Sequence, residues 1–494
     1  MANEMRQTMT KFWEEHSRDA SLEEMMLDSG AQLLSKEETE EIVLLLPCLD
    51  GLNVLELGAG IGRYTGHLAE LASQVTAVDF MQNFIDKNRE KNGYRRNITF
   101  LQADVTLLDL PNDRYDFIFS NWLFMYLTDE EIVALTQKML GWLRPGSYLF
   151  FRESCFYPSG DCERTCNPTV YRTPAQYNHL LTSAYSKSGD NGFEIVMSKS
   201  VQTYIKVKKN QNQVCWMLQK VPRSTDSHQG YTTFQQFLDN QQYSRKGILR
   251  YEKIFGDGFV STGGLETTKE FIAMLNLVPG QRVIDVGCGI GGGDFYMAKT
   301  YGVEVLGMDL SSNMVEIAME RAVKENAPEQ VQFEIGDATR RIFPEASFDV
   351  VYSRDTILHI NDKGALFRKF YSWLKPGGKL LITDYCCGGR PWSSVFEEYV
   401  KKRGYVLYTP EQYGKFLQKV GFVRVQVQDR TEQFVQVLKK ELAHTREIKQ
   451  EFLESFSEED YNYIIEGWKE KLHRCSLGDQ RWGLFLAEKP KDII

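Results

Sequence analysis

The sequence contains no apolar run long enough to cross a membrane as a helix. No stretch of its 494 residues approaches the roughly 18 uninterrupted apolar residues that such a helix needs, and residues 1–17 have no apolar core of the kind found in secretory signal peptides. We therefore expect a soluble, cytoplasmic protein without membrane insertion.

The sequence also lacks the cysteine pairs typical of metal sites and disulfide frameworks. Its nine cysteines are odd in number and include no Cys-x-x-Cys pair, which disfavours both zinc and disulfides. We expect reduced thiols and no metal. An excess of basic charge is missing too, because the formal net charge is −9. This balance argues against nucleic acid as the main partner, since neutralising phosphates requires a net basic face.

One pattern is present twice. Residues 53–63 (NVLELGAGIGR) and 282–293 (RVIDVGCGIGGG) each run from a short apolar stretch through an acid into a cluster of glycines. An apolar, β-branched run that ends in glycines is typical of a buried parallel strand that turns sharply into a helix and presents backbone amides to a ligand. A chain of this length also suits two large domains, since a typical domain has roughly 150 residues.

The elements after each glycine cluster recur in the same order, about 230 residues apart. Predicted strands end in Asp79 and Asp309, in Asp104 and Asp337, and in Ser120 and Ser353, and the turn WLRPG at 142–146 is matched by WLKPG at 373–377. This order indicates a duplication. We predict one domain over residues 1–220, a linker over 221–233 and a second domain over 234–494.

Strands that alternate with helical segments at this spacing predict an α/β fold, with an open, mostly parallel sheet in each domain. Ligands bind outside the carboxyl ends of the strands in such sheets. The acids named above stand at those ends, so we expect the binding sites there.

Two ligands compete for the glycine turns. Gly287, Gly289 and Gly292 satisfy G-x-G-x-x-G, and Asp309 follows about 20 residues later, as a nicotinamide dinucleotide site requires, so an oxidoreductase remains an alternative. The first copy does not fit that spacing. Glu56 and Asp285 also stand two residues before the first glycine, where a carboxylate would repel a pyrophosphate but attract the cationic amine of S-adenosylmethionine.

The further acids suit the same cofactor. Asp79 and Asp309 can accept hydrogen bonds from both ribose hydroxyls, and Asp104 and Asp337 can accept one from the adenine amino group. Acid-x-Gly-x-Gly followed by two strand-end acids resembles the signature of class I methyltransferases, which bind S-adenosylmethionine on a Rossmann-like, mostly parallel seven-stranded sheet.

The remaining motifs resemble one family closely. They are the segment 239–264 (DNQQYSRKGILRYEKIFGDGFVSTGG), SRDTILHI at 353–360, ITDY at 382–385, EYVKKRGY at 398–405, NWLFMY at 121–126 and RESC at 152–155. Together they resemble the two-domain phosphoethanolamine N-methyltransferases of plants and animals over essentially the whole chain. The resemblance implies that phosphoethanolamine is methylated three times, through its mono- and dimethyl forms, to phosphocholine for choline and phosphatidylcholine synthesis. It also implies that the first domain performs the first methylation and the second domain the later two.

The resemblance assigns residues to roles. It makes Tyr243 and His359 the latch and base that remove the amine proton, with Asp355 orienting His359; from the pattern alone, His359 would be a core histidine. The cofactor residues that it implies, one set for each domain, are Glu56, Gly58, Arg63, Asp79, Asp104, Val105 and Asn121, and then Val260, Ser261, Asp285, Gly287, Asp309, Asp337, Ala338 and Arg354. The implied acceptor residues are Ser154, Ser159, Gly160, Arg164, Tyr171 and Arg172 in the first domain, and Gln242, Tyr243, Tyr251, Tyr385, Tyr399, Arg403, Tyr405 and Lys471 in the second.

The first domain departs from the second at the base. Aligning Ser120 with Ser353 places Tyr126 at the position of His359 and Trp122 at that of Asp355. The proton chemistry of the two domains therefore cannot be the same, and residues 159–172 offer Arg164, Tyr171 and Arg172 as a separate grip on the phosphate. An alternative is that the first domain only binds S-adenosylmethionine, as a regulatory module.

Overall fold

The computed structural model describes residues 2–17, 19, 21–160, 168–223, 234–324 and 329–491. Contacts divide the chain into two compact units, Met1–Phe237 and Leu238–Ile494. The short helix α9 (Phe234–Phe237) belongs by its contacts to the first unit, although the sequence prediction starts the second domain at residue 234. Most of the predicted linker, 224–233, lies outside the described residues.

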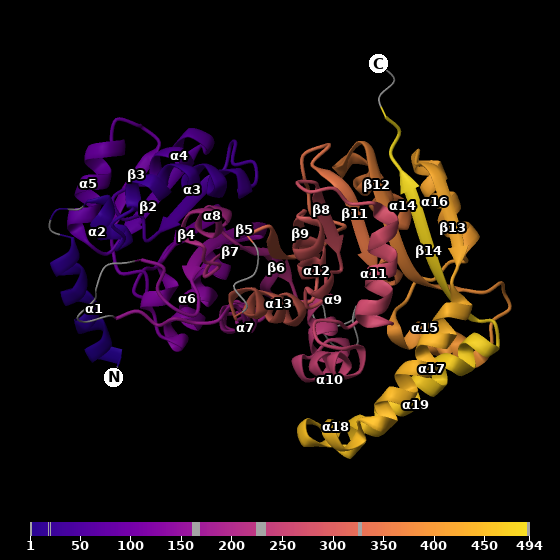
Figure 1. Ribbon diagram of the computed structural model, residues 1–494. Helices are drawn as coiled ribbons and strands as arrows, with labels where there is room; N and C mark the ends of the chain where they lie inside the picture. The colour runs from indigo at the N-terminus through magenta and orange to yellow at the C-terminus, as the bar shows by residue number, and fades with distance from the viewer. Residues whose placement is uncertain are drawn as a thin grey trace. The chain divides into compact units, whose positions relative to one another are not determined.

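The first unit is a mostly parallel sheet covered by helices (Figure 1). Its described strands are β1 (Asn53–Leu57), β2 (Gln74–Asp79), β3 (Ile98–Gln102), β4 (Tyr115–Asn121), β5 (Leu143–Ser154), β6 (Asn191–Ser200) and β7 (Gln213–Pro222), and its other helices are α1 (Ala2–His16), α2 (Leu22–Met26), α3 (Ala31–Leu45), α4 (Thr65–Leu71), α5 (Gln82–Asn92), η1 (Phe124–Tyr126), α6 (Asp129–Trp142), α7 (Pro174–Thr182) and α8 (Gln202–Lys208). The strand order is β6-β7-β5-β4-β1-β2-β3. Only β7 runs antiparallel to its neighbours among these strands.

The second unit repeats this plan. Its described strands are β8 (Arg282–Val286), β9 (Glu304–Asp309), β10 (Val331–Gly336), β11 (Phe348–Arg354), β12 (Leu374–Cys387), β13 (Val423–Asp429) and β14 (Gln480–Glu488), and its helices are η2 (Leu238–Gln242), α10 (Arg245–Phe255), α11 (Gly264–Leu275), α12 (Gly292–Tyr301), α13 (Ser312–Lys324), η3 (Ile357–His359), α14 (Lys363–Trp373), α15 (Ser394–Arg403), α16 (Pro410–Val420), α17 (Thr431–Glu447), α18 (Lys449–Ser455) and α19 (Glu458–Ser476). The order β13-β14-β12-β11-β8-β9-β10 matches the first unit strand for strand, with β14 antiparallel to β12 and β13. The predicted α/β fold and the duplication are confirmed.

Apolar strands explain why the sheets form where they do. All but the first residue of β1 and of β8 are buried, as expected for central parallel strands covered on both faces. Each unit has its own apolar core between sheet and helices, around Phe117 and Phe150 in the first and around Phe367 and Leu380 in the second. The carboxyl ends of the strands, where the sites are expected, are therefore supported by a packed apolar core in each unit.

The units differ most in their insertions. In the second unit, helices α17, α18 and α19 (residues 431–476, hereafter the helical arm) lie between β13 and β14 in the chain and extend away from the sheet, in yellow in Figure 1. In the first unit, the segment after β5 (residues 155–172, hereafter the acceptor loop) is described except for residues 161–167. These insertions are where the two sites can differ.

Candidate active site

Both glycine clusters form the same backbone turn after the first strand of their unit. Gly58 and Gly287 have φ of +73° and +88°, which only glycine adopts without strain, and a Cβ built on Gly287 would collide with Thr356. The amide of Gly60 donates to Asp79 Oδ2 at 2.8 Å, and that of Gly289 donates to Asp309 Oδ2 at 3.0 Å. The acid at the end of the second strand is thus fixed against the turn in both units.

The acids before the glycines are buried. Burial raises the pKa of both Glu56 and Asp285 to about 8, although Thr65 Oγ1 donates to Glu56 Oε2 at 2.6 Å and the charge of Arg354 opposes the shift at Asp285. Asp285 Oδ1 is buried and has no hydrogen-bond partner among the described residues. A buried carboxylate of this kind suits a cationic group, so the site fits the amine of S-adenosylmethionine.

The first unit gathers its predicted cofactor residues around one cavity, of about 120 Å³. Its lining includes Glu56, Gly58, Arg63, Asp79, Asp104, Val105 and Asn121, together with the predicted acceptor residues Ser154, Ser159 and Gly160. Arg164 lies outside the described residues.

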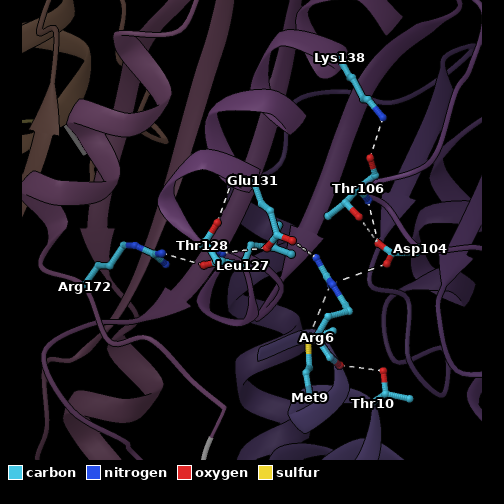
Figure 2. A network of polar contacts seen from close by, with 10 residues as sticks. All are labelled: Arg6, Met9, Thr10, Asp104, Thr106, Leu127, Thr128, Glu131, Lys138 and Arg172. Carbon is cyan, nitrogen blue, oxygen red and sulfur yellow. Dashed lines mark hydrogen bonds and ion pairs between the residues drawn. The ribbon is translucent and has the colours of Figure 1, made fainter. Parts of the chain in front are cut away.

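Helix α1 also contributes to this cavity. Arg6 lies 3.8 Å from Asp104 Oδ2 and pairs with Glu131 (Figure 2). Trp13 lines the same cavity, and its ring centre lies 5.4 Å from that of Tyr126. Arg6 and Trp13 were not predicted as site residues, because a helical pattern does not show which of its residues reach a site.

A buried charge cluster lies beside the first-unit cavity. Glu38 pairs with Arg63 at 2.9 Å and also with Arg152, and all three side chains are buried. The guanidinium carbon of Arg152 lies 3.9 Å from the ring centre of Trp122, a cation–π contact. Neither Glu38 nor Arg152 was predicted as a site residue, since no local pattern joins residues this far apart in the chain.

Arg172 lies against the turn around η1. Its side chain is 3% exposed and donates to Asp129 Oδ1, to the Phe124 carbonyl at 3.1 Å and to the Leu127 carbonyl at 2.7 Å. Neither Arg172 nor Tyr171 belongs to the lining of the cavity. The guanidinium is held by the backbone carbonyls of the turn around η1 and by Asp129.

The second unit joins Tyr243 and His359. Tyr243 OH lies 3.3 Å from His359 Nε2, where η2 meets η3. Burial, and then the charges of Lys363 and Arg403, lower the pKa of His359 to about 3. The imidazole is therefore neutral at pH 7, and a pKa this low makes it a weak base in this structure.

Asp355 is fixed by hydrogen bonds from two other residues. It has φ of +51°, and its Oδ1 accepts hydrogen bonds from Trp482 Nε1 at 2.8 Å and from Thr383 Oγ1 at 3.2 Å. Arg354, just before it, donates to Thr268 Oγ1 and to the Thr262 carbonyl at 2.7 and 2.8 Å. Both residues shape the turn after β11.

The other predicted cofactor residues of the second unit lie around the turn. Val260 packs with Ile290 and would contact a Cβ built on Gly289, while the Ser261 carbonyl accepts from the amide of Gly264. Asp337 Oδ1 accepts from the amide and hydroxyl of Thr339 at 2.8 and 2.6 Å, and Ala338 is buried in the core.

The predicted acceptor residues of the second unit form one aromatic and cationic cluster. The ring centre of Tyr405 lies 5.0 Å from that of His359 and 5.7 Å from that of Tyr399, and Arg403 lies 6.0 Å from the Tyr399 ring centre. Gln242 Nε2 donates to the Arg403 carbonyl at 3.1 Å. Burial raises the pKa of Tyr385 well above its usual value, and the nearby charge of Asp355 adds to the shift.

The helical arm supplies the rest of this cluster. Lys471 Nζ lies 4.3 Å from the ring centre of Trp468, which lies 6.1 Å from that of Tyr251. Glu441 accepts from the Trp468 indole at 2.8 Å and from the amide of Gly263 at 2.7 Å. Burial lowers the pKa of Lys471 to about 8, with the charge of Glu441 opposing the shift. Glu441 and Trp468 were missed by sequence reasoning because helices in an insertion give no sign of their orientation.

Comparison with known proteins decides the family. A family model described as "Methyltransferase domain" matches residues 54–146 and again 283–378. Phosphoethanolamine N-methyltransferase 3 of Arabidopsis thaliana is 54% identical over 491 residues, which are 98% of this chain and 99% of that protein. The chain belongs to the phosphoethanolamine N-methyltransferase family. The Triticum aestivum phosphoethanolamine N-methyltransferase, 53% identical over 98% of this chain and 96% of its own length, agrees with this assignment.

A solved structure of the family has the same two-unit fold. Haemonchus contortus phosphoethanolamine N-methyltransferase 2, in complex with phosphomonomethylethanolamine and S-adenosylhomocysteine, matches with a TM-score of 0.77 and 28% identity over 93% of this chain and 99% of that one. The units are tandem class I methyltransferase domains that use S-adenosylmethionine, and the nicotinamide alternative is set aside. Among the described residues, no helix could span a membrane and no group of His, Cys, Asp and Glu could hold a metal.

Proposed function

We propose that the protein converts phosphoethanolamine to phosphocholine in three methylations, the first unit performing the first and the second unit the later two. The observation that supports this division is the pair Tyr243 and His359, because the first unit has Tyr126 where the second has its histidine. A general base must be unprotonated before it acts, and His359 is neutral at pH 7.

We assign the proton transfer in the second unit to His359. The acceptor nitrogen loses a proton to His359 Nε2, which frees its lone pair. Bound S-adenosylmethionine would supply the methyl group: the nitrogen–carbon bond would form as the carbon–sulfur bond breaks, leaving S-adenosylhomocysteine. Tyr243 OH, 3.3 Å from that nitrogen, fixes the plane of the imidazole. Arg403 and Lys471 provide positive charge for the phosphate end, and Tyr399 and Tyr405 provide rings that tolerate the growing ammonium charge.

The cofactor residues follow the same logic in both units. Glu56 and Asp285 take the cationic amine, and Asp79 and Asp309 take the ribose hydroxyls from positions fixed by the glycine turns. Ser154, Ser159 and Gly160 take the acceptor in the first unit, at the cavity that also receives the cofactor.

Two full-chain variants test the division. Asp79→Ala disables cofactor binding in the first unit and Asp309→Ala in the second, and products are identified by mass after incubation with phosphoethanolamine. Asp309→Ala should accumulate phosphomonomethylethanolamine. Asp79→Ala should leave phosphoethanolamine unused but should convert added phosphomonomethylethanolamine to phosphocholine. Phosphocholine formed from phosphoethanolamine by Asp79→Ala would contradict the division and favour a regulatory first unit.

We also propose a cytoplasmic location. Among the described residues no cysteine forms a disulfide, which suits a reducing compartment. A fluorescent fusion of the full chain that collected in the secretory pathway would contradict this placement.

A further inference from the structure

The backbone turn that carries Tyr126 is held from two sides in the first unit. Glu153, at the end of β5, accepts hydrogen bonds from the amides of Leu123, Phe124 and Met125 at 3.0, 2.7 and 3.2 Å. Arg172 donates to the carbonyls at the two ends of the same turn, those of Phe124 and Leu127. A buried acid thus satisfies the amides of η1, and a buried cation satisfies its carbonyls.

The turn that carries His359 is held in the same way by different residues. Asp384 of β12 accepts from the amide of Leu358 at 3.1 Å and from Tyr413 OH at 2.9 Å. Lys363, 2% exposed, donates to the Ile357 carbonyl at 2.5 Å and to the Ile360 carbonyl at 3.3 Å.

The residues that make these contacts occupy corresponding positions, although Glu153 accepts from three amides of its turn and Asp384 from one. Phe124 and Ile357 each begin the short helix after the fourth strand of their unit, and Leu127 and Ile360 each follow it. In each unit, the last residue of the fourth strand pairs with a residue of the fifth strand. Glu153 and Asp384 each come directly after that paired residue. Only the cation differs in origin: Lys363 opens the helix directly after the turn, whereas Arg172 ends the acceptor loop.

We propose that Arg172 with Glu153, and Lys363 with Asp384, are positioning residues that fix the turns presenting Tyr126 and His359 to the acceptor nitrogen. This proposal rests on the proposed function, since it assumes that both turns face an acceptor. Without the cation, the Leu127 carbonyl or the Ile360 carbonyl loses its side-chain donor, whereas those of Phe124 and Ile357 keep the amides of Leu127 and Ile360. A carbonyl left without a donor gives the turn a reason to move. A displacement of about 1 Å at a reacting group can cost up to about a hundredfold in rate.

In the first unit this arrangement also links the turn to the acceptor loop. Arg172 forms a β-bridge with Cys155, and the Arg172 carbonyl accepts a hydrogen bond from the amide of Phe156. The amide of Val170 donates to the Met125 carbonyl at 2.8 Å. Both ends of the loop are therefore tied to the turn. In the second unit, the amide of Val406, next to Tyr405, makes the corresponding bond to the Leu358 carbonyl at 2.8 Å, so the turn there is also tied to the acceptor segment, although Lys363 is not part of that segment.

Each unit contains a matched control lysine. Lys220 Nζ donates to the Leu143 carbonyl at 2.6 Å, and Lys489 Nζ donates to the Leu374 carbonyl at 2.8 Å. Both carbonyls belong to the first residue of the fifth strand of their unit, at the edge of the sheet opposite the site. Lys220→Met and Lys489→Met remove a lysine–carbonyl bond without touching the turns.

The first-unit test uses full-chain Asp309→Ala as the parent, so that one unit turns over. Arg172→Met should lower kcat for phosphoethanolamine at least about tenfold with KM within about twofold, and Arg172→Lys should recover to within about threefold, because a lysine serves two carbonyls in the second unit. Lys220→Met should keep kcat within about twofold. A raised KM with unchanged kcat would make Arg172 a phosphate ligand and overturn the proposal, as would an equal loss of kcat in Lys220→Met.

The second-unit test uses full-chain Asp79→Ala with phosphomonomethylethanolamine as the substrate. Lys363→Met should lower kcat at least about tenfold, whereas Lys489→Met should not. Unchanged kcat in Lys363→Met would overturn the proposal for this unit. If a methionine variant does not fold, Arg172→Lys and Lys363→Arg decide, since retained kcat supports the proposal and a tenfold loss overturns it. The products of the two parent variants, Asp309→Ala and Asp79→Ala, test the division of the methylations between the units before any further substitution. Failure of the positioning proposal can therefore be distinguished from failure of that division.

Discussion

The indole Nε1 of Trp482, on β14, donates to Asp355 Oδ1, on the turn after β11, at 2.8 Å. The first unit has a corresponding bond in which the tryptophan is on the turn and the acceptor is on the strand. There, Trp122 occupies the position of Asp355 and donates to Gln213 Oε1, also at 2.8 Å. Gln213 pairs with Ser154 across β7 and β5, as Trp482 pairs with Tyr385 across β14 and β12. Each bond therefore ties the turn before the short helix to the strand beside an acceptor residue.

Trp482→Phe should remove this donor while keeping an aromatic ring in place. A buried carboxylate that loses a partner is destabilised by about 1–3 kcal/mol, so we expect a lower Tm and about a tenfold loss of kcat with the monomethyl ester. Release of S-adenosylhomocysteine measures the rate. Trp373→Phe, in the apolar core of the same unit, is the control and should lower Tm without a comparable loss of kcat. Equal kcat losses in both variants would refute the role of the bond.

His359→Ala should lower kcat for the later methylations about 10²- to 10⁴-fold at pH 7, the range expected for loss of a general base. Tyr243→Phe keeps the ring but not the hydroxyl and should cost less. Because the pKa of His359 is lowered to about 3, the wild-type rate should show no histidine-dependent fall between pH 8 and pH 5. A loss of acceptor affinity with unchanged kcat in His359→Ala would make it a binding residue.

Binding of S-adenosylmethionine should release protons at pH 7. Burial raises the pKa of Glu56 and Asp285 to about 8, so both are mostly protonated at pH 7, whereas a bound cation favours the charged carboxylate. Affinity should rise with pH and level off above about pH 8. Calorimetry in two buffers of different ionisation enthalpy measures the released protons, and Asp285→Asn should remove the share of the second unit. Affinity independent of pH would contradict this.

Arg6→Ala should raise the KM for S-adenosylmethionine in the first unit about three- to fivefold. Arg6 ties α1 to Asp104 and Glu131, and a partly exposed ion pair is worth about 0–1 kcal/mol. The assay uses the Asp309→Ala parent with phosphoethanolamine. Lys11→Ala, exposed on the same helix, should leave this KM unchanged, and a similar rise in both variants would mean that helix α1 as a whole, not Arg6, sets the affinity.

The sheet and its duplication could be predicted because both depend on local patterns. Apolar strands that end in glycine or aspartate fix the strand, the turn and the edge where ligands bind, and β1 and β8 begin within the predicted segments. The acids before and beyond the glycines, such as Asp285 and Asp309, reach the predicted turn because they follow short strands whose direction is set by the sheet. Family resemblance added the acceptor residues, which no spacing alone would have identified.

The rest of the site depends on contacts between distant parts of the chain. Glu441 and Trp468 come from an arm whose helices carry no sign of which face reaches the sheet, and Glu38 meets Arg152 only after folding. Arg172 was predicted as a phosphate ligand from the family resemblance and from its place in the insertion of the first domain. Its three bonds to the turn and to Asp129 depend on backbone carbonyls, which a sequence does not display.

The different origins of Lys363 and Arg172 bear on genetic recombination between the two halves of the coding sequence. An unequal crossover in the coding sequence of the helix after the turn, beyond Lys363, would join a second-unit turn to a first-unit acceptor loop. That hybrid would contain both Lys363 and Arg172, which would compete for the same pair of turn carbonyls. The reciprocal hybrid would contain neither cation. Each product is disadvantaged at a buried turn, so gene conversion across this interval should be selected against and the duplicated halves should diverge independently.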